Sequence, residues 1–386
     1  MEASPSSGFW PVTHPAWMTH TRGRKDNPRK YRNRGNGASS LREMALRSCI
    51  WNIDNYGEDT LSSVPLYYGT MIYDRLMTGN TLSIRSWLLF KARYQENIRD
   101  HYRLTVRGDS SESPKEIPSI AKQLSSLSFE TLTFICIRNL PIDMDALWQL
   151  MHITSLRVLM LQDSGALRHE VFDLSETVAK PDAGEITDYI VRKWSDAVHD
   201  RRHFPNLRVL ELQSAGITTG ALKSVALFPS LVFCNLIFPS AQFLLDGLGD
   251  SPWVPCTHAS TQNNSQNFNP STILARLDID MHRKMALLYQ AALDYVDTSN
   301  LATSPKGDLP ILSLDYTDPS DQNSSHRNRS MWYLRTSDGC KTLQESLDST
   351  QGRRRRREND DQFQQGKRKI RASRKKGVDS LLGEFF

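Results

Sequence analysis

The sequence predicts an α/β protein in which a short helical module precedes a repetitive domain of strands and helices, with disordered basic arms at both ends. Three observations predict this organisation. Apolar residues recur at three- and four-residue steps within residues 39–105, short apolar segments with strand-like spacing recur within residues 119–342, and both ends of the chain are polar and basic. The 386 residues, 39% of them hydrophobic, are enough for a packed core in part of the chain.

The helical module begins with a capping-box pattern, because Ser40 is followed three residues later by Glu43. A first helix then carries apolar residues at helical spacing: Leu41, Met44, Ala45, Leu46, Cys49, Ile50 and Ile53. Gly57 marks a break, Pro65 begins a second helix that runs through Leu76, and a third helix follows Gly79. Residues 106–118 are polar and predict a linker.

The centre of the chain is repetitive. The segment from Ser155 to Gln162 (SLRVLMLQ) is nearly duplicated from Asn206 to Gln213 (NLRVLELQ), and the FPNL at Phe204 returns 24 residues later as the FPSL at Phe228. The same step separates Leu132 from Leu156. A period of 20–29 residues with an L-x-x-L-x-L strand predicts a leucine-rich-repeat arc over residues 119–342.

Two features make this arc irregular. The consensus asparagine is replaced at each turn, by Leu140, Ser164, Ala215 and Pro239, none of which can form the usual side-chain ladder. The wide gap between Leu156 and Leu207 holds either a long insertion or an unrecognised repeat. Weaker strands are expected at Leu274/Leu277/Ile279 and at Leu309/Leu312/Leu314, and return helices are expected over residues 142–152 and 185–200.

The charge is divided unevenly along the chain. Residues 353–376 carry twelve Lys/Arg and three acids (+9), and residues 22–34 carry seven Lys/Arg and one acid (+6). Because the whole chain carries +5, the remainder carries −10. An acidic body thus lies between basic arms, residues 1–38 and 343–386, which we expect to be disordered. Nucleic acid, if bound, would be bound by the arms alone.

The C-terminal arm contains two basic clusters that are separated by a short spacer. They are Arg353, Arg354, Arg355, Arg356 and Arg357, followed by Lys367, Arg368 and Lys369. This spacing is typical of a bipartite nuclear-import signal, so we expect a nuclear location. An arm that neutralises phosphates without sequence preference is an alternative interpretation, and the two are compatible. The sequence shows neither the layout of a signal peptide nor an apolar segment long enough to span a membrane, so we expect neither feature.

The end of the arm is apolar. Leu382, Phe385 and Phe386 resemble the apolar positions of the PCNA-interacting motif Q-x-x-h-x-x-F-F, although Asp379 stands where that motif has glutamine. The resemblance implies docking to a sliding clamp. Docking to another groove is the alternative that the residues themselves leave open.

Residues 40–90 carry a second family likeness. Ser40-Leu41-x-x-x-Ala45-x-x-x-Cys49, then Asn52-Ile53-Asp54 and Val64-Pro65, resemble the BC-box region of elongin A, which continues into an F-box-like helix. The family has a cysteine where this chain has Ala45. The resemblance implies that Leu41, Ala45, Cys49 and Pro65 bind an adaptor, elongin C or an F-box adaptor. It further implies that Pro65, Ile72, Leu76 and Trp87 pack an F-box-like core. Helices that only cap the end of the repeat array are the alternative.

Catalytic motifs are not found. The chain lacks GxxxxGK[ST], GxSxG and HExxH, and its five cysteines contain no CxxC pair. We therefore expect neither an enzyme, nor a cofactor, nor a metal site. The function that the sequence favours is a nuclear protein-interaction scaffold, in particular a substrate receptor of a cullin–RING ubiquitin ligase. The alternative is a chromatin- or replication-associated protein that uses its basic tail and terminal Phe-Phe motif.

Overall fold

The structure is a computed structural model, and it describes the chain in segments. These are residues 39–79, 81–107, 114, 116–125, 127, 129–162, 186–199, 203–214, 216–218, 220–237, 252–256, 269–298, 309–318 and 331–336. Within these segments the chain forms ten α-helices and one mixed eight-stranded sheet. The predicted basic arms, residues 1–38 and 343–386, lie outside the described residues, as does most of the polar stretch 108–115.

Four helices form the N-terminal module: α1 (Leu41–Trp51), α2 (Glu58–Ser62), α3 (Leu66–Thr78) and α4 (Ile84–Arg93). The predicted start of α1 is confirmed, since Ser40 is its N-cap and the Ser40 Oγ accepts a hydrogen bond from the Glu43 amide at 3.2 Å. Pro65 is the N-cap of α3, as the sequence predicts. The short α2 was not expected; it begins directly after Gly57.

The core of the module is made by fully buried side chains of α2, α3 and α4, among them Leu61, Leu76, Trp87 and Phe90. The module is joined to the sheet through Tyr102, whose ring lies 5.6 Å from that of Trp87 and whose hydroxyl donates to the Leu82 carbonyl at 3.1 Å. Of the four residues predicted to pack this core, Ile72, Leu76 and Trp87 lie in one buried cluster, whereas the prediction is wrong for Pro65, which is exposed.

The sheet has the strand order β1-β7-β2-β3-β4-β5-β8-β6. The strands from β1 to β5 in this order are parallel, whereas β8 pairs antiparallel with both β5 and β6. Their bounds are β1 (His101–Arg107), β2 (Leu132–Arg138), β3 (Leu156–Gln162), β4 (Val209–Gln213), β5 (Phe233–Ile237), β6 (Trp253–Pro255), β7 (Ile311–Thr317) and β8 (Met331–Arg335).

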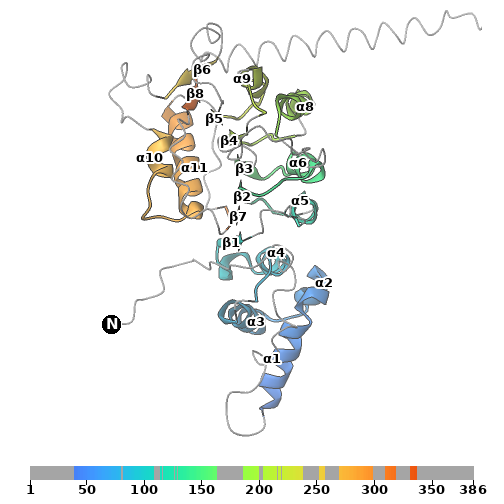
Figure 1. The fold of residues 1–386 in the computed structure, drawn as a ribbon. Helices are drawn as coiled ribbons and strands as arrows, with labels where there is room; N and C mark the ends of the chain where they lie inside the picture. The colour runs from blue at the N-terminus through green and yellow to red at the C-terminus, as the bar shows by residue number, and fades with distance from the viewer. Residues whose placement is uncertain are drawn as a thin grey trace, which may run out of the picture. The chain divides into compact units, whose positions relative to one another are not determined.

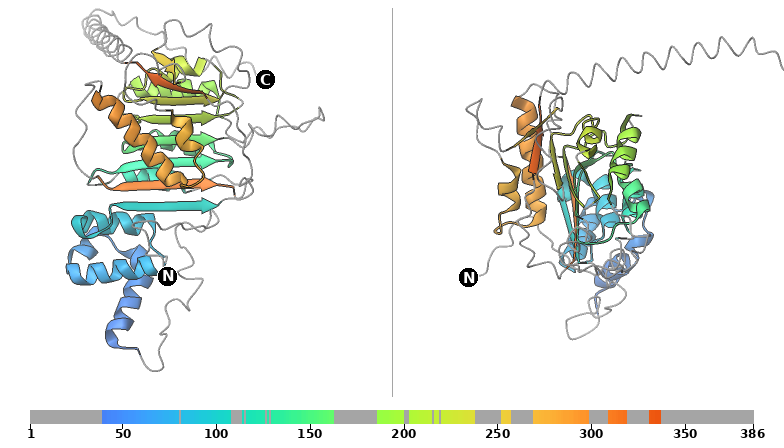
Figure 2. Two further views of the ribbon diagram at one scale, coloured as in Figure 1. Left: turned by 90° about the vertical axis from the view of Figure 1, so that its left-hand side faces the viewer. Right: turned by 45° about the horizontal axis from the view of Figure 1, so that its top comes forward.

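Helices cover both faces of the sheet (Figure 1). One face carries α5 (Ile117–Ser125), α6 (Met144–Leu150), α8 (Asp188–His199) and α9 (Gly220–Val225). The opposite face carries α10 (Pro270–Leu274) and α11 (Met281–Thr298), and α11 crosses the strands obliquely (Figure 2). The leucines of the L-x-x-L-x-L segments, such as Leu156, Leu159 and Leu161, pack toward the α6/α8 side, whereas the intervening residues Val158 and Met160 pack under α11.

Two sequence-based predictions differ from the structure. The strand expected at Leu274/Leu277/Ile279 is wrong, because this segment forms the end of α10 and a turn in which Leu277 is 98% exposed. Asn269 caps α10 and Pro270 occupies its first turn, and these signals decide the local structure. The sheet also begins earlier than expected, since β1 starts at His101, inside the segment expected to be helical.

The strand predicted around Leu312 and Leu314 is confirmed as β7, but β7 does not follow the other repeats in space. It lies between β1 and β2. Strand β3 pairs directly with β4, so no strand lies between them; residues 163–185 of the gap between Leu156 and Leu207 lie outside the described residues.

Candidate protein-interaction surfaces

Helix α1 has apolar side chains on two opposite faces. Ile50 and the half-buried Leu46 pack into the core of the module. On the opposite face, Leu41 is 79% exposed and Met44 is 50% exposed. Ala45, Ser48 and Trp51 are also exposed and complete the same helical stripe, since residues at steps of three and four share a face. We call the set Leu41, Met44, Ala45, Ser48 and Trp51 the outward face of α1.

Polar contacts fix the orientation of α1 against α3. The Arg42 guanidinium donates to the Tyr67 hydroxyl at 2.9 Å and lies over the Tyr67 ring. The next residue, Glu43, forms an ion pair with Arg75 of α3. Because these contacts come from the side of α1 that faces α3, they leave the outward face pointing away from α3. Further along the chain, after α2, the tip of α3 exposes the side chains of Leu66, Tyr67 and Tyr68.

The four residues predicted to bind an adaptor do not share one surface. Leu41 and Ala45 lie on the outward face of α1. Cys49 is half-buried and its thiol contacts the Tyr56 hydroxyl; burial, reinforced by this contact, raises the pKa of Tyr56 to about 12. Pro65 is exposed at the start of α3. The predicted import clusters (353–357 and 367–369) and the terminal motif (Leu382, Phe385 and Phe386) lie outside the described residues.

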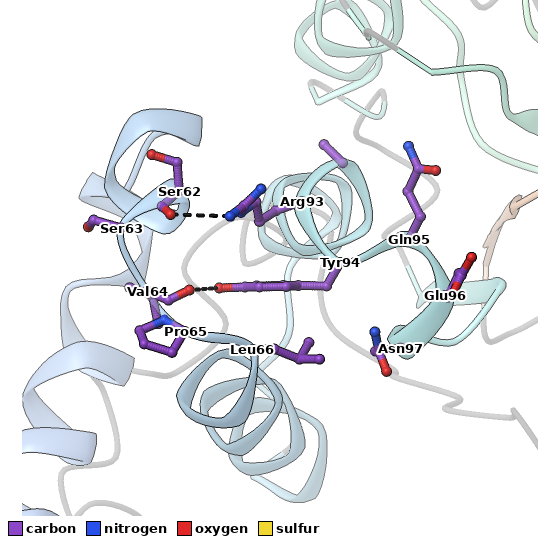
Figure 3. A pocket seen from close by; sticks show the side chains of 11 residues that line it. Ser62, Ser63, Val64, Pro65, Leu66, Arg93, Tyr94, Gln95, Glu96 and Asn97 are labelled. Carbon is purple, nitrogen blue, oxygen red and sulfur yellow. Dashed lines mark hydrogen bonds between the residues drawn. The ribbon is translucent and has the colours of Figure 1, made fainter.

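Pro65 also lines an open cavity of about 620 Å³ (Figure 3). The cavity lies between the α2–α3 connection and the end of α4, residues 62–66 and 92–97. Tyr94 holds its two walls together, because the Tyr94 hydroxyl donates to the Val64 carbonyl at 2.8 Å. Arg93 adds a hydrogen bond to the Ser62 carbonyl at 3.3 Å. The cavity thus lies beside the exposed tip of α3.

A polar region lies on the sheet face that carries α11. Strand pairing places residues of neighbouring strands in rows across the sheet, and the character of the rows changes along the strands. In the first row, Phe134, Val158, Val209 and Phe233 are apolar and buried under α11, whereas Ser313 and Arg103, which continue the row on β7 and β1, are polar. The second row is mixed: Asp315, Cys136, Met160, Glu211 and Asn235 are all buried. The third row, at the carboxyl ends of the strands, consists on β1 to β4 of Arg107, Thr317, Arg138, Gln162 and Gln213, and Gln213 pairs with Ile237 of β5.

The two buried carboxylates of the second row hold side chains of the third. Asp315 is 5% exposed and accepts two hydrogen bonds from the Arg138 guanidinium, each at 3.1 Å. Glu211 is 4% exposed, and its Oε1 accepts from the Gln213 amide at 2.5 Å and from the Asn235 amide at 2.9 Å. Burial raises the pKa of Glu211 to about 7, even though these hydrogen bonds and Arg138 act in the opposite direction.

A buried histidine connects α11 to the first two strands of the sheet. His282 Nε2 lies 2.9 Å from the Thr105 hydroxyl of β1, and its Nδ1 lies 2.8 Å from the Ser313 hydroxyl of β7. Burial lowers the pKa of His282, and Asp315 opposes this shift. The imidazole is therefore neutral near pH 7 and acts as a link between elements.

In the described part of the chain, no three His, Cys, Asp or Glu side chains come together as metal ligands. Among the same residues, no helix is long and apolar enough to cross a membrane.

The sequence pattern could have shown the two-faced character of α1, because Met44, Ala45 and Leu46 are consecutive apolar residues that cannot share one face. The third row depends on strand register, which the sequence does not reveal.

Searches with the whole chain against protein-family models, curated proteins and solved structures found no match.

Proposed function

We propose that the protein is a nuclear protein-interaction scaffold that serves as the substrate receptor of a cullin–RING ubiquitin ligase. The outward face of α1 carries the proposal. A helix that is apolar on opposite faces is expected to be covered on both, and the described residues cover one. Large exposed apolar side chains in a contiguous stripe are typical of a helix that docks into a partner's groove.

The resemblance of residues 40–90 to the BC-box region of elongin A implies the partner class, elongin C or an F-box adaptor. In this interpretation α1 to α4 form an F-box-like module, and the units from β2 to β5 form an irregular leucine-rich-repeat arc. In support, β2 to β5 are neighbours in sequence order, and α6, α8 and α9 lie on one face of the sheet (Figure 1). Helices that only cap the array would need one apolar face; α1 has two.

The test is co-purification of the full chain with elongin C, compared with the Leu41→Asp variant. Leu41 is 79% exposed, so the substitution should not disturb the fold, and it places a carboxylate in an apolar contact. We expect elongin C to be recovered with the natural chain and the amount to fall about tenfold or more with the variant, as for a central contact residue.

The matched control is Leu277→Asp, because Leu277 is a leucine in the turn after α10 that is even more exposed than Leu41. This variant should recover as much elongin C as the natural chain. Absence of elongin C and of an F-box adaptor from stringent pulldowns of the natural chain would refute the receptor proposal. An equal loss with both variants would refute the role of the outward face of α1.

A second candidate function rests on the terminal apolar motif of the sequence. In this proposal the protein associates with chromatin or the replication machinery, the basic tail contacts DNA, and Leu382, Phe385 and Phe386 bind a sliding clamp (PCNA). Replacing Phe385 and Phe386 together by alanine should abolish clamp capture, measured by pulldown with purified clamp. Unchanged capture after this replacement would contradict the role of the motif.

A further inference from the structure

The third row of the sheet forms a polar surface that the proposed function does not yet use. Arg107 is exposed, and Thr317, Arg138, Gln162 and Gln213 are each partly exposed. The strand tips that carry them extend beyond α10 and α11 (Figure 2). Because neighbouring strands lie about 4.8 Å apart, the five side chains span roughly 19 Å from β1 to β4.

The side chains of this row are rich in hydrogen-bond donors and lack an acid. Two guanidinium groups, one hydroxyl and two amides follow one another across the sheet. Asp315 neutralises Arg138 from the buried row below, whereas no ion pair of Arg107 is found among the described residues. Within the described part of the chain, the positive charge of this surface that no ion pair compensates thus lies at the β1 end, and the neutral amides lie toward β4.

The buried row below keeps part of this surface in place. Arg138 is held by two hydrogen bonds to Asp315, and Gln213 by one to Glu211. Burying two carboxylates is costly, and a common reason to retain such groups is that they fix the orientation of functional neighbours. A surface whose side chains are already oriented loses less conformational entropy when a ligand binds.

We propose that the third row binds an extended acidic peptide segment that runs across the strand tips, with a carboxylate at Arg107 and backbone carbonyls at the amides. A span of roughly 19 Å accommodates about six extended residues. Nucleic acid fits less well, because a phosphate backbone needs a denser line of uncompensated cations than one end of this row offers. This inference rests on the proposed function, since it names the substrate class of the receptor.

The experiment maps where an acidic peptide binds on the full chain. The probe is an oligoglutamate peptide of about ten residues with a photo-reactive group, which is cross-linked at physiological salt and located by mass spectrometry. The basic arms will also attract it, so the location of the cross-links is the readout. We expect cross-links in residues 101–107, 132–138 or 311–317 in addition to any in the arms.

Two charge reversals test the surface directly. Arg107→Glu places a carboxylate in the row, and should reduce cross-linking to these strands about tenfold or more through like-charge repulsion. Arg85→Glu is the matched control, because Arg85 is an exposed arginine of α4 in the helical module. It should leave cross-linking to the strands unchanged.

Several outcomes would overturn the inference. They are cross-links confined to the arms, an equal effect of both reversals, or displacement of the peptide from these strands by a single-stranded oligonucleotide at lower concentration. Cross-linking of the peptide to the strands should not depend on adaptor binding, so we expect the Leu41→Asp variant to be cross-linked to the same extent as the natural chain. Strand cross-links without elongin C recovery would refute the receptor and keep the peptide site, whereas the reverse pattern would refute the peptide site alone.

Discussion

Glu211 is a buried carboxyl whose ionisation we expect to affect stability. Burial raises its pKa from 4.5 to about 7, so the folded protein binds this proton more tightly than the unfolded chain does. The stabilising contribution is therefore complete below about pH 4.5 and is lost as the pH rises through about 7. The difference corresponds to a change on the order of 3 kcal/mol in the free energy of unfolding.

Glu211→Gln should remove this dependence, because glutamine resembles the protonated acid at every pH. In urea unfolding at about pH 8 the variant should be more stable than the natural protein, and at about pH 5 the two should be similar. Glu96→Gln, at an exposed position, is the control and should change neither value. A variant that is less stable at the higher pH would contradict the prediction.

Gly69 allows Tyr94 to connect the walls of the cavity. A Cβ at position 69 would lie 2.5–2.7 Å from the Tyr94 ring, closer than side chains can pack. Gly69→Ala should therefore lower the free energy of unfolding by about 1–3 kcal/mol, as overpacking does. At Gly57 nothing lies within 4 Å of the added Cβ, so Gly57→Ala should have a much smaller effect. Thermal unfolding of both variants provides the comparison.

At the scale of elements, α11 depends on a neutral His282. Because burial lowers its pKa below 6.5, the stability that His282 contributes is present above about pH 6.5 and is lost as the pH falls through the folded-state pKa. Acidification should therefore loosen α11 from β1 and β7 before it affects α3 or α4.

Hydrogen exchange of the α11 amides between about pH 7 and pH 5, corrected for the intrinsic rate, measures this loosening. His282→Gln should reduce the acid dependence, because glutamine does not gain a proton in this range. His101→Gln, at an exposed residue of β1, should keep the dependence of the natural protein. Equal acid dependence in all three proteins would contradict the role of His282.

The elements also show how far the sequence alone predicts the structure. The L-x-x-L-x-L pattern predicts β3, β4 and β7 correctly, because its last two leucines are two residues apart and therefore face the same side of a strand, as Leu159 and Leu161 do. It fails at residues 274–279, where Asn269 and Pro270 start a helix. The face of α1 that binds its neighbours and the place of β7 between β1 and β2 depend on long-range packing, which local patterns do not contain.

For the candidate surfaces, the sequence identifies Leu41 and Ala45 but groups them with Cys49, which contacts Tyr56 instead. The third row could not be predicted, since Arg107, Arg138 and Gln213 belong to strands far apart in the chain and meet only through register.

At the scale of the whole molecule, the division of charge predicts where the protein is found. Residues 343–386 should carry a fused fluorescent protein into the nucleus, because their two basic clusters are spaced for an import receptor. Alanine in place of Arg353–Arg357 should abolish this accumulation, as microscopy of the two fusions would show. A fusion of residues 22–34, which carry +6 in a single cluster, is the control for basic charge alone.

The position of β7 has a consequence for synthesis. Seven residue pairs join β7 to β1 and seven join it to β2, yet residues 311–317 leave the ribosome long after residues 101–138. Until they emerge, the two earlier strands lack their common neighbour, and nascent chains present unpaired strand edges that chaperones must shield. The β1–β7–β2 part of the sheet can therefore be completed only late in synthesis, and we expect fragments that end before residue 311 to leave the edges of β1 and β2 unpaired and to aggregate.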